Sequence, residues 1–241
     1  MGALYDEIGR GYATRRRTEP RIAAPLHAAL GDARTVVNVG AGAGGYEPAD
    51  REVVAVEPSA AMIAQRPDGA GPAVRATAEA LPFADGAFDA AMAVLTVHHW
   101  SDVARGLAEM RRVATGPLVA LTCAPEAGFW LHDYLPGLRA LDRATMPPMA
   151  AFAAAWGAVE VVPVPIPHDC VDGLLAAHWR RPDAYLDPAV RAATSPFALV
   201  DATAGLARLA TDLDSGAWRR AHGALLTRDA LDCGYRLVRT V

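Results

Sequence analysis

One short segment restricts the fold of this chain more than any other. The apolar run Val36-Val37-Asn38-Val39 leads directly into the glycine-rich sequence Gly40-Ala41-Gly42-Ala43-Gly44-Gly45. β-Branched residues predict a buried strand, and glycines allow the backbone after it to turn sharply and to approach a ligand closely. The N-terminus of a helix that follows such a loop offers free N–H groups. The segment therefore predicts a strand followed by a ligand-binding loop.

Short β-type runs alternate with helical segments along the first half of the chain. Strands are predicted over residues 36–39, 52–56, 73–76, 88–97 and 118–122, and helices capped by Ser59 and Ser101 lie between them. Strands that alternate with helices over about 100 residues indicate a parallel sheet that is covered on both faces. The length of 241 residues suits one domain of this kind.

The composition excludes several chemistries. All 23 positively charged residues are arginine, and the chain contains no lysine. This excludes lysine Schiff bases, the phosphate-binding lysine of P-loops and the Tyr-x-x-x-Lys pair of short-chain dehydrogenases. The net charge is −4, and the arginines are scattered apart from Arg15-Arg16-Arg17. A basic surface for nucleic acid is therefore not expected.

Cysteine usage and hydropathy indicate a cytoplasmic protein with no membrane partner. The three cysteines, Cys123, Cys170 and Cys233, are widely spaced, without the pairing typical of a metal site, and we interpret them as reduced thiols. The longest uncharged run, residues 144–159, contains two prolines and is too short to span a bilayer. The polar N-terminus is not a signal peptide.

The glycine-rich loop alone does not identify its ligand. The spacing Gly40-x-Gly42-x-Gly44 fits a loop for S-adenosylmethionine (SAM), and Gly40-x-Gly42-x-x-Gly45 fits the dinucleotide fingerprint equally well. Glu57 ends the second predicted strand, where an acid can bind the ribose hydroxyls of either cofactor. A tight turn beside a solvated acid remains an alternative.

The residues that follow distinguish between these ligands. The run Ala78–Asp89, which contains Leu81-Pro82-Phe83, precedes the fourth predicted strand, His98-His99-Trp100 follows it, and Glu109-x-x-Arg112 lies in the next helix. In this order the motifs resemble the class I SAM-dependent methyltransferases, in the small-molecule (type 11) branch. The resemblance covers residues 35–122, and weakly 5–17. It implies a Rossmann-like, seven-stranded, mostly parallel sheet, with SAM as methyl donor and S-adenosylhomocysteine (SAH) as product.

The resemblance also implies a cofactor site. Gly40, Ala41 and Gly42 would line the methionine moiety, Glu57 would bind the ribose, Pro58, Met62, Ala78 and Glu79 would surround the adenine, Val94 and Leu95 would lie below the sulfonium, and Tyr12 would cover the cofactor. Two positions depart from the family pattern. Asn38 replaces the usual acid, so it can orient the loop but has no charge for the ammonium group, and Thr77 stands where many relatives have Asp.

The catalytic residues are less constrained by the sequence. Positioning supplies much of the rate of methyl transfer, and a base is needed only for an acceptor of high pKa. Our hypothesis is that His168, with His98 or His99, acts as a base toward the acceptor. We expect this acceptor to be an aromatic or heterocyclic small molecule, of secondary-metabolite or quinone-like type. The alternative is structural: His98 and His99 are then a pair at the start of a helix, and Asp169 is a helix N-cap.

The second half of the chain predicts the substrate side of the domain. Helices are expected over residues 129–141 and 149–156, an edge strand over 159–164, helical fragments including 169–179, 188–193 and 199–213, and a last strand over 235–240. We therefore divide the single domain (1–241) into an N-terminal helical cap (1–33), a SAM-binding core (34–167), a helical substrate cover (168–232) and a terminal strand (233–241).

Three functions remain open from the sequence. The first is methyl transfer to oxygen, nitrogen or carbon of a small molecule, with no metal. The second is a SAM-binding protein that acts in cyclisation or regulation, and the third is an NAD-dependent oxidoreductase. A homodimer is also open.

Overall fold

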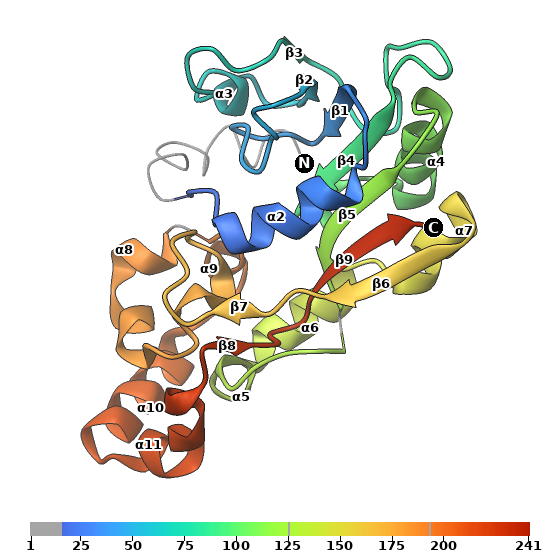
Figure 1. Ribbon diagram of the computed structural model, residues 1–241. Helices are drawn as coiled ribbons and strands as arrows, with labels where there is room; N and C mark the ends of the chain where they lie inside the picture. Colours follow the sequence, from blue (N-terminus) through green and yellow to red (C-terminus); the bar gives the residue numbers. More distant parts are fainter. Residues whose placement is uncertain (1–15, 125, 193) are drawn as a thin grey trace.

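The computed structural model describes residues 16–124, 126–192 and 194–241 (Figure 1). Seven strands form one sheet in the order β3-β2-β1-β4-β5-β9-β6. Their bounds are β1 (Thr35–Val39), β2 (Glu52–Val56), β3 (Ala73–Val74), β4 (Ala90–Val94), β5 (Leu118–Cys123), β6 (Val159–Pro163) and β9 (Tyr235–Thr240). All pairs among β1 to β5 are parallel, and β9 is antiparallel to both β5 and β6. The predicted Rossmann-like, seven-stranded, mostly parallel sheet is confirmed.

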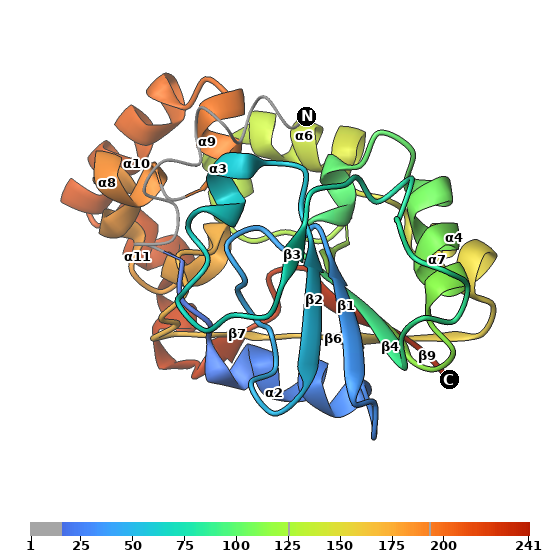
Figure 2. The same cartoon turned by 90° about the horizontal axis from the view of Figure 1, so that it is seen from above.

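Neighbouring residues of the central strands face two different apolar cores, as expected for a sheet that is covered on both faces. Val36 belongs to the core that contains residues of α2 (Pro20–Ala29). Val37 belongs to the core that contains residues of α4 (Val103–Val113) and α7 (Met149–Trp156). Figure 2 shows α2 on one side of the sheet and α4 and α7 on the other.

Short helices make up most of the remaining structure. Those after β2, β4 and β5 are α3 (Ala60–Ile63), η2 (Val97–His99), α5 (Leu131–Tyr134) and α6 (Pro136–Thr145). The region before β9 contains η3 (Leu175–His178), η4 (Pro182–Leu186), α8 (Pro188–Arg191), α9 (Pro196–Leu199), α10 (Thr203–Asp214), α11 (Ala217–His222) and η5 (Gly223–Thr227). The strands β7 (Ile166–Pro167) and β8 (Ala230–Leu231) pair at its two ends. The part of the chain that the structure describes contains no helix that could cross a membrane.

Some local predictions were wrong, because side-chain contacts with distant residues decide these places. The helix expected over 169–179 is reduced to η3, since residues 169–172 bond instead to α2 and to the segment before it. The cap of α4 is Asp102, whose carboxylate accepts a hydrogen bond from the Arg105 N–H at 2.9 Å. Ser101 donates its N–H and hydroxyl to the Glu79 carboxylate instead.

The motif Glu109-x-x-Arg112 on α4 holds the segment before β4 in place. The Arg112 guanidinium bonds to the Glu109 carboxylate at 2.8 Å and donates to the carbonyl oxygens of Leu81 and Phe83 at 3.0 and 2.8 Å. Glu109 also accepts the Leu81 N–H at 2.9 Å. Because the same segment continues back to Ala78, this pair fixes part of the wall of the site described below.

We expect Arg112→Met to lower the free energy of unfolding by about 1–3 kcal/mol, since it removes the arginine partner of Glu109 and the side-chain donor to two carbonyl groups. Arg239→Met is the matched control, because the Arg239–Glu160 pair is exposed on both sides and contributes about 0–1 kcal/mol. Urea unfolding of the two variants measures the difference. Equal losses of stability would contradict this role of Arg112.

Candidate functional site

The loops after β1, β2 and β4 surround a cavity of about 570 Å³. This edge is expected to hold the ligand, because the carboxyl ends of parallel strands meet there. Most residues assigned from the sequence line the cavity, namely Gly40, Ala41, Gly42, Glu57, Pro58, Met62, Ala78, Glu79, Val94, Leu95 and His99. Asn38, His98 and His168 are not among its lining residues, and Tyr12 lies outside the described residues.

Glycine is required at position 40 by both conformation and space. Gly40 has a φ of +70°, and a Cβ built there would lie 2.0 Å from the Thr96 hydroxyl oxygen. The N–H groups of Gly40 and Ala41 both donate to the Val56 carbonyl oxygen, at 2.8 and 3.0 Å. The loop after β1 is therefore held against the end of β2 and packs tightly against the loop after β4.

The Glu57 carboxylate joins two loops of the site. It accepts the Gly42 N–H at 2.8 Å on one oxygen and the Ser59 N–H at 2.9 Å on the other. Ser59 in turn caps α3, because its hydroxyl accepts the Met62 N–H at 3.3 Å. Glu57 is only 7% exposed, so its carboxylate forms a preorganised negative group in the wall of the cavity.

Asn38 lies below the glycine loop, and its neighbour explains why it is not an acid. Its amide donates to the Glu47 carboxylate at 3.0 Å, and Glu47 also pairs with Arg66 at 2.8 Å. A carboxylate at position 38 would face the Glu47 carboxylate at hydrogen-bond distance, and two like charges that close repel each other. The amide can donate where a carboxylate can only accept.

Glu79 is anchored by the start of α4. Besides the two bonds from Ser101, at 2.7 and 2.8 Å, its carboxylate accepts the Asp102 N–H at 3.2 Å. Burial by itself raises the pKa of a carboxyl group, but the hydrogen bonds from Ser101 and the backbone lower the pKa of Glu79 overall. The side chain therefore stays ionised, and it connects the wall of the cavity to α4.

The end of β4 has a strained backbone. Leu95 has a φ of +53°, and its N–H donates a hydrogen bond to the Leu121 carbonyl oxygen at 2.8 Å. A left-handed conformation is unfavourable for a branched side chain and persists only where the surroundings enforce it. Here the turn brings Thr96 against Gly40 and places Val94 and Leu95 in the wall of the cavity.

The two neighbouring histidines of η2 occupy different places. Their rings lie 3.9 Å apart between centroids, and His99 lines the cavity. Burial lowers the pKa of His99 to about 4, and burial together with the charge of His99 lowers the pKa of His98 to about 3. His98 Nδ1 has no hydrogen-bond partner among the described residues. His99 is thus a neutral imidazole that faces the cavity, and His98 packs against it.

The third predicted histidine lies elsewhere. The His168 N–H donates to the Asp229 carbonyl oxygen at 2.9 Å, next to the β7–β8 pair. The β7–β8 pairing holds His168 beside Asp229, and His168 is not among the residues that line the cavity.

Sequence reasoning missed one side of the cavity. This side is formed by Arg16, Arg17, Thr18, Tyr46 and Asp172. The arginine run 15–17 is visible in the sequence as a short basic run at the end of the weak family resemblance, but no cavity role follows from it there. Nothing in the sequence connects Asp172 with a loop 126 positions earlier in the chain.

The fold and the site together define a class of protein. A mostly parallel sheet, a glycine loop after its first strand and a buried acid at the end of its second are the features of a Rossmann-like protein that binds a nucleoside-containing cofactor. The chain includes a methyltransferase domain, whose family model matches residues 37–116.

Comparison with solved structures specifies the family. The chain is 32% identical to a protein of Anabaena variabilis ATCC 29413 that is described as a methyltransferase from an antibiotic biosynthesis pathway. The match covers 94% of this chain and 99% of that chain, with a TM-score of 0.87. No curated protein sequence matches this chain significantly. The chain belongs to the class I SAM-dependent methyltransferases, and its cofactor is SAM.

Two more distant structures share the fold. The [4+2]-cyclase SpnF is 17% identical, over 99% of this chain and 94% of that chain, with a TM-score of 0.57. Geranyl diphosphate C-methyltransferase of Streptomyces coelicolor A3(2) is 18% identical, over 90% of this chain and 76% of that chain, with a TM-score of 0.52.

The residues present fit SAM. Gly40 and Gly42 present backbone without a side chain to the cavity, Glu57 offers a buried carboxylate in its wall, and Met62 adds an apolar surface. The NAD-dependent oxidoreductase that the sequence left open is excluded by the family to which the chain belongs.

We expect Gly40→Ala to lower the free energy of unfolding by about 1–3 kcal/mol, because alanine is strained at positive φ and its Cβ meets Thr96. Gly45→Ala is the matched control, since a Cβ at Gly45 has no neighbour within 4 Å. We expect that variant to unfold within about 0.5 kcal/mol of the parent protein. Urea unfolding compares the two, and equal stability would contradict the close approach of Gly40 to Thr96.

Proposed function

We propose that this protein transfers the methyl group of SAM to an oxygen, nitrogen or carbon atom of a small acceptor. The acceptor is aromatic or heterocyclic, of secondary-metabolite or quinone-like type. The 32% identity to the Anabaena variabilis protein, over 94% of the chain, carries this proposal, because that protein is described as part of an antibiotic biosynthesis pathway. The cavity volume of about 570 Å³ supports it, since it lies in the range for small-molecule ligands.

The cofactor contacts that we propose follow the lining of the cavity. Gly40, Ala41 and Gly42 bind the methionine moiety, Glu57 binds the ribose, Pro58, Met62, Ala78 and Glu79 surround the adenine, and Val94 and Leu95 support the reacting end. Asn38 does not line the cavity, and its proposed role is to support the glycine-rich loop from below by donating a hydrogen bond to Glu47. Tyr12 as a cover for the cofactor remains a prediction.

The chemistry divides between cofactor and protein. SAM would supply a methyl group activated by a sulfonium, whose sulfur would leave as the neutral thioether of SAH. The protein supplies position and, for an acceptor that must lose a proton, a base. Of the three histidines that we considered, His99 is the one that lines the cavity, so we assign it the role of base. Trp100 also lines the cavity and offers an aromatic surface to a planar acceptor.

Cyclisation or regulation remains the second candidate function. The fold is shared with a [4+2]-cyclase, although at 17% identity this likeness concerns the fold alone.

A cytoplasmic location also remains a prediction. A homodimer and the absence of nucleic-acid and membrane partners remain predictions as well.

Incubation with a panel of phenols, quinols and nitrogen heterocycles tests the proposed reaction. We expect one of these compounds to gain a methyl group in place of a hydrogen, with one SAH formed for each product molecule. Mass spectrometry of both products measures this outcome. A product with the mass of its substrate, formed without consumption of SAM, would establish cyclisation and contradict methyl transfer.

The pH dependence tests His99. Its pKa of about 4 lies below the ordinary value of about 6.5, so the imidazole is neutral over the whole neutral range. We expect kcat to fall only as the pH approaches about 4, and not near 6.5.

We expect His99→Gln to lower kcat by about 10²-fold or more and to leave the Kd of SAH within about threefold. His168→Gln serves as the comparison, since His168 lies outside the lining of the cavity. A loss of kcat in His168→Gln without a loss in His99→Gln would reverse the assignment.

A further inference from the structure

One carboxylate joins three distant parts of the chain at the cavity. Asp172 belongs to the cover, lines the cavity and is only 2% exposed. The Arg16 guanidinium donates to both of its oxygens, at 2.5 and 3.0 Å, and the Arg17 N–H donates to one of them at 3.2 Å. The Tyr46 hydroxyl donates to the other at 2.7 Å. Four donors from two separate segments therefore meet on this side chain.

Tyr46 connects this carboxylate with the cofactor loop. It ends the glycine-rich loop with a φ of +66°, a conformation that needs support from its surroundings. The support is present: its N–H donates to the Thr18 hydroxyl at 3.1 Å, and its carbonyl oxygen is hydrogen-bonded to His27 Nε2 at 2.9 Å. The end of the cofactor loop is thus held by the segment before α2, by α2 itself and by the cover.

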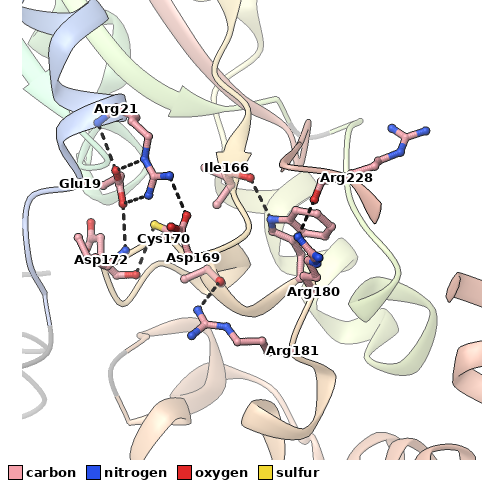
Figure 3. Close-up of polar contacts among 12 residues, drawn as sticks. Glu19, Arg21, Ile166, Asp169, Cys170, Asp172, Arg180, Arg181 and Arg228 are labelled. Carbon is pink, nitrogen blue, oxygen red and sulfur yellow. Dashed lines mark hydrogen bonds and ion pairs between the residues drawn. The ribbon is translucent and has the colours of Figure 1, made fainter. Parts of the chain in front are cut away.

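Glu19, Arg21 and Asp169 form a second set of contacts, which Figure 3 shows near Asp172. The Glu19 carboxylate is fully buried and accepts from the Arg21 guanidinium at 2.6 Å and from the Val171 N–H at 3.0 Å. The bond to Arg21 lowers the pKa of Glu19 to about 2. Arg21 also pairs with Asp169 at 2.7 Å, but both of these side chains are at least half exposed. An exposed pair of this kind contributes little.

We propose that Asp172 is a positioning residue for SAM. Asp172 touches the cofactor loop through Tyr46 and the cavity wall at 16–18 through Arg16, so it sets the distance between these two sides of the cofactor cavity. Because the cofactor lies between them, the affinity for SAM and the rate of SAH release depend on this carboxylate. Asp172 acts through Arg16 and Tyr46, and it takes no part in the chemistry of transfer.

The argument depends on burial and on the number of donors. A charged group that is removed from water is stabilised only by well-placed partners, and breaking such a pair leaves the other charge uncompensated. The two parallel hydrogen bonds between Arg16 and Asp172 also fix the orientation of the two side chains relative to each other. A residue that only stabilised the fold would have no need to reach the lining of the cavity and the cofactor loop at once.

The first test compares Asp172→Asn with Asp169→Asn. Asp172 pairs with Arg16 and Asp169 pairs with Arg21, and of the two aspartates only Asp172 lines the cavity. We expect Asp172→Asn to weaken SAH binding by about tenfold or more, mainly through faster dissociation, because a charge-assisted contact is lost. Asp169→Asn should stay within about twofold. Calorimetry measures the Kd, and stopped-flow fluorescence measures the dissociation rate.

Two further variants keep the test independent of folding. Tyr46→Phe removes one hydrogen bond to Asp172 and leaves the charge pair in place, and we expect it to weaken SAH binding about threefold to tenfold. The double variant Arg16→Gln/Asp172→Asn removes both charges, so it should regain thermal stability relative to Asp172→Asn without regaining affinity. Affinity for SAH within twofold of the parent protein in all three variants, with a lowered Tm, would overturn the proposal.

Discussion

The parallel pairing of β1 with strands on both sides is the constraint on which the site depends. β1 pairs in register with β2 from Thr35 to Val39 and with β4 at Val36 to Asn38. The loops that leave these three strands must therefore emerge side by side at one edge. Gly40 can then approach Thr96, and the Glu57 carboxylate can accept the Gly42 N–H. The cavity for the cofactor follows from this arrangement.

The departure from the family pattern at Asn38 is explained by the residue that it contacts in the structure. Position 38 holds an amide because the Glu47 carboxylate lies 3.0 Å from its nitrogen, and the negative charge at this place belongs to Glu47. The buried Asp172 with its arginine partner is another charged pair near the same loop. Both arrangements use arginine, the only basic residue type of the chain apart from histidine.

Much of the fold could be predicted, because local patterns and burial agree over the first half of the chain. The helix Met149–Trp156 and the strand Tyr235–Thr240 were found with the predicted bounds. Residues 169–172 do not form the predicted helix, because their bonds are to residues about 150 positions away. The same distance explains why Asp172 and Tyr46 were missed at the site.

The sequence by itself determined the class of fold, the glycine loop and the family, because these depend on residues that are close together in the chain. It also placed His98 and His99 beside the sheet edge that binds the ligand. Only the tertiary structure decided which of the two lines the cavity, and only it joined Arg16, Tyr46 and Asp172 around one carboxylate. The physical reason is that buried charges find their partners through space, and no local pattern in the chain records such a pairing.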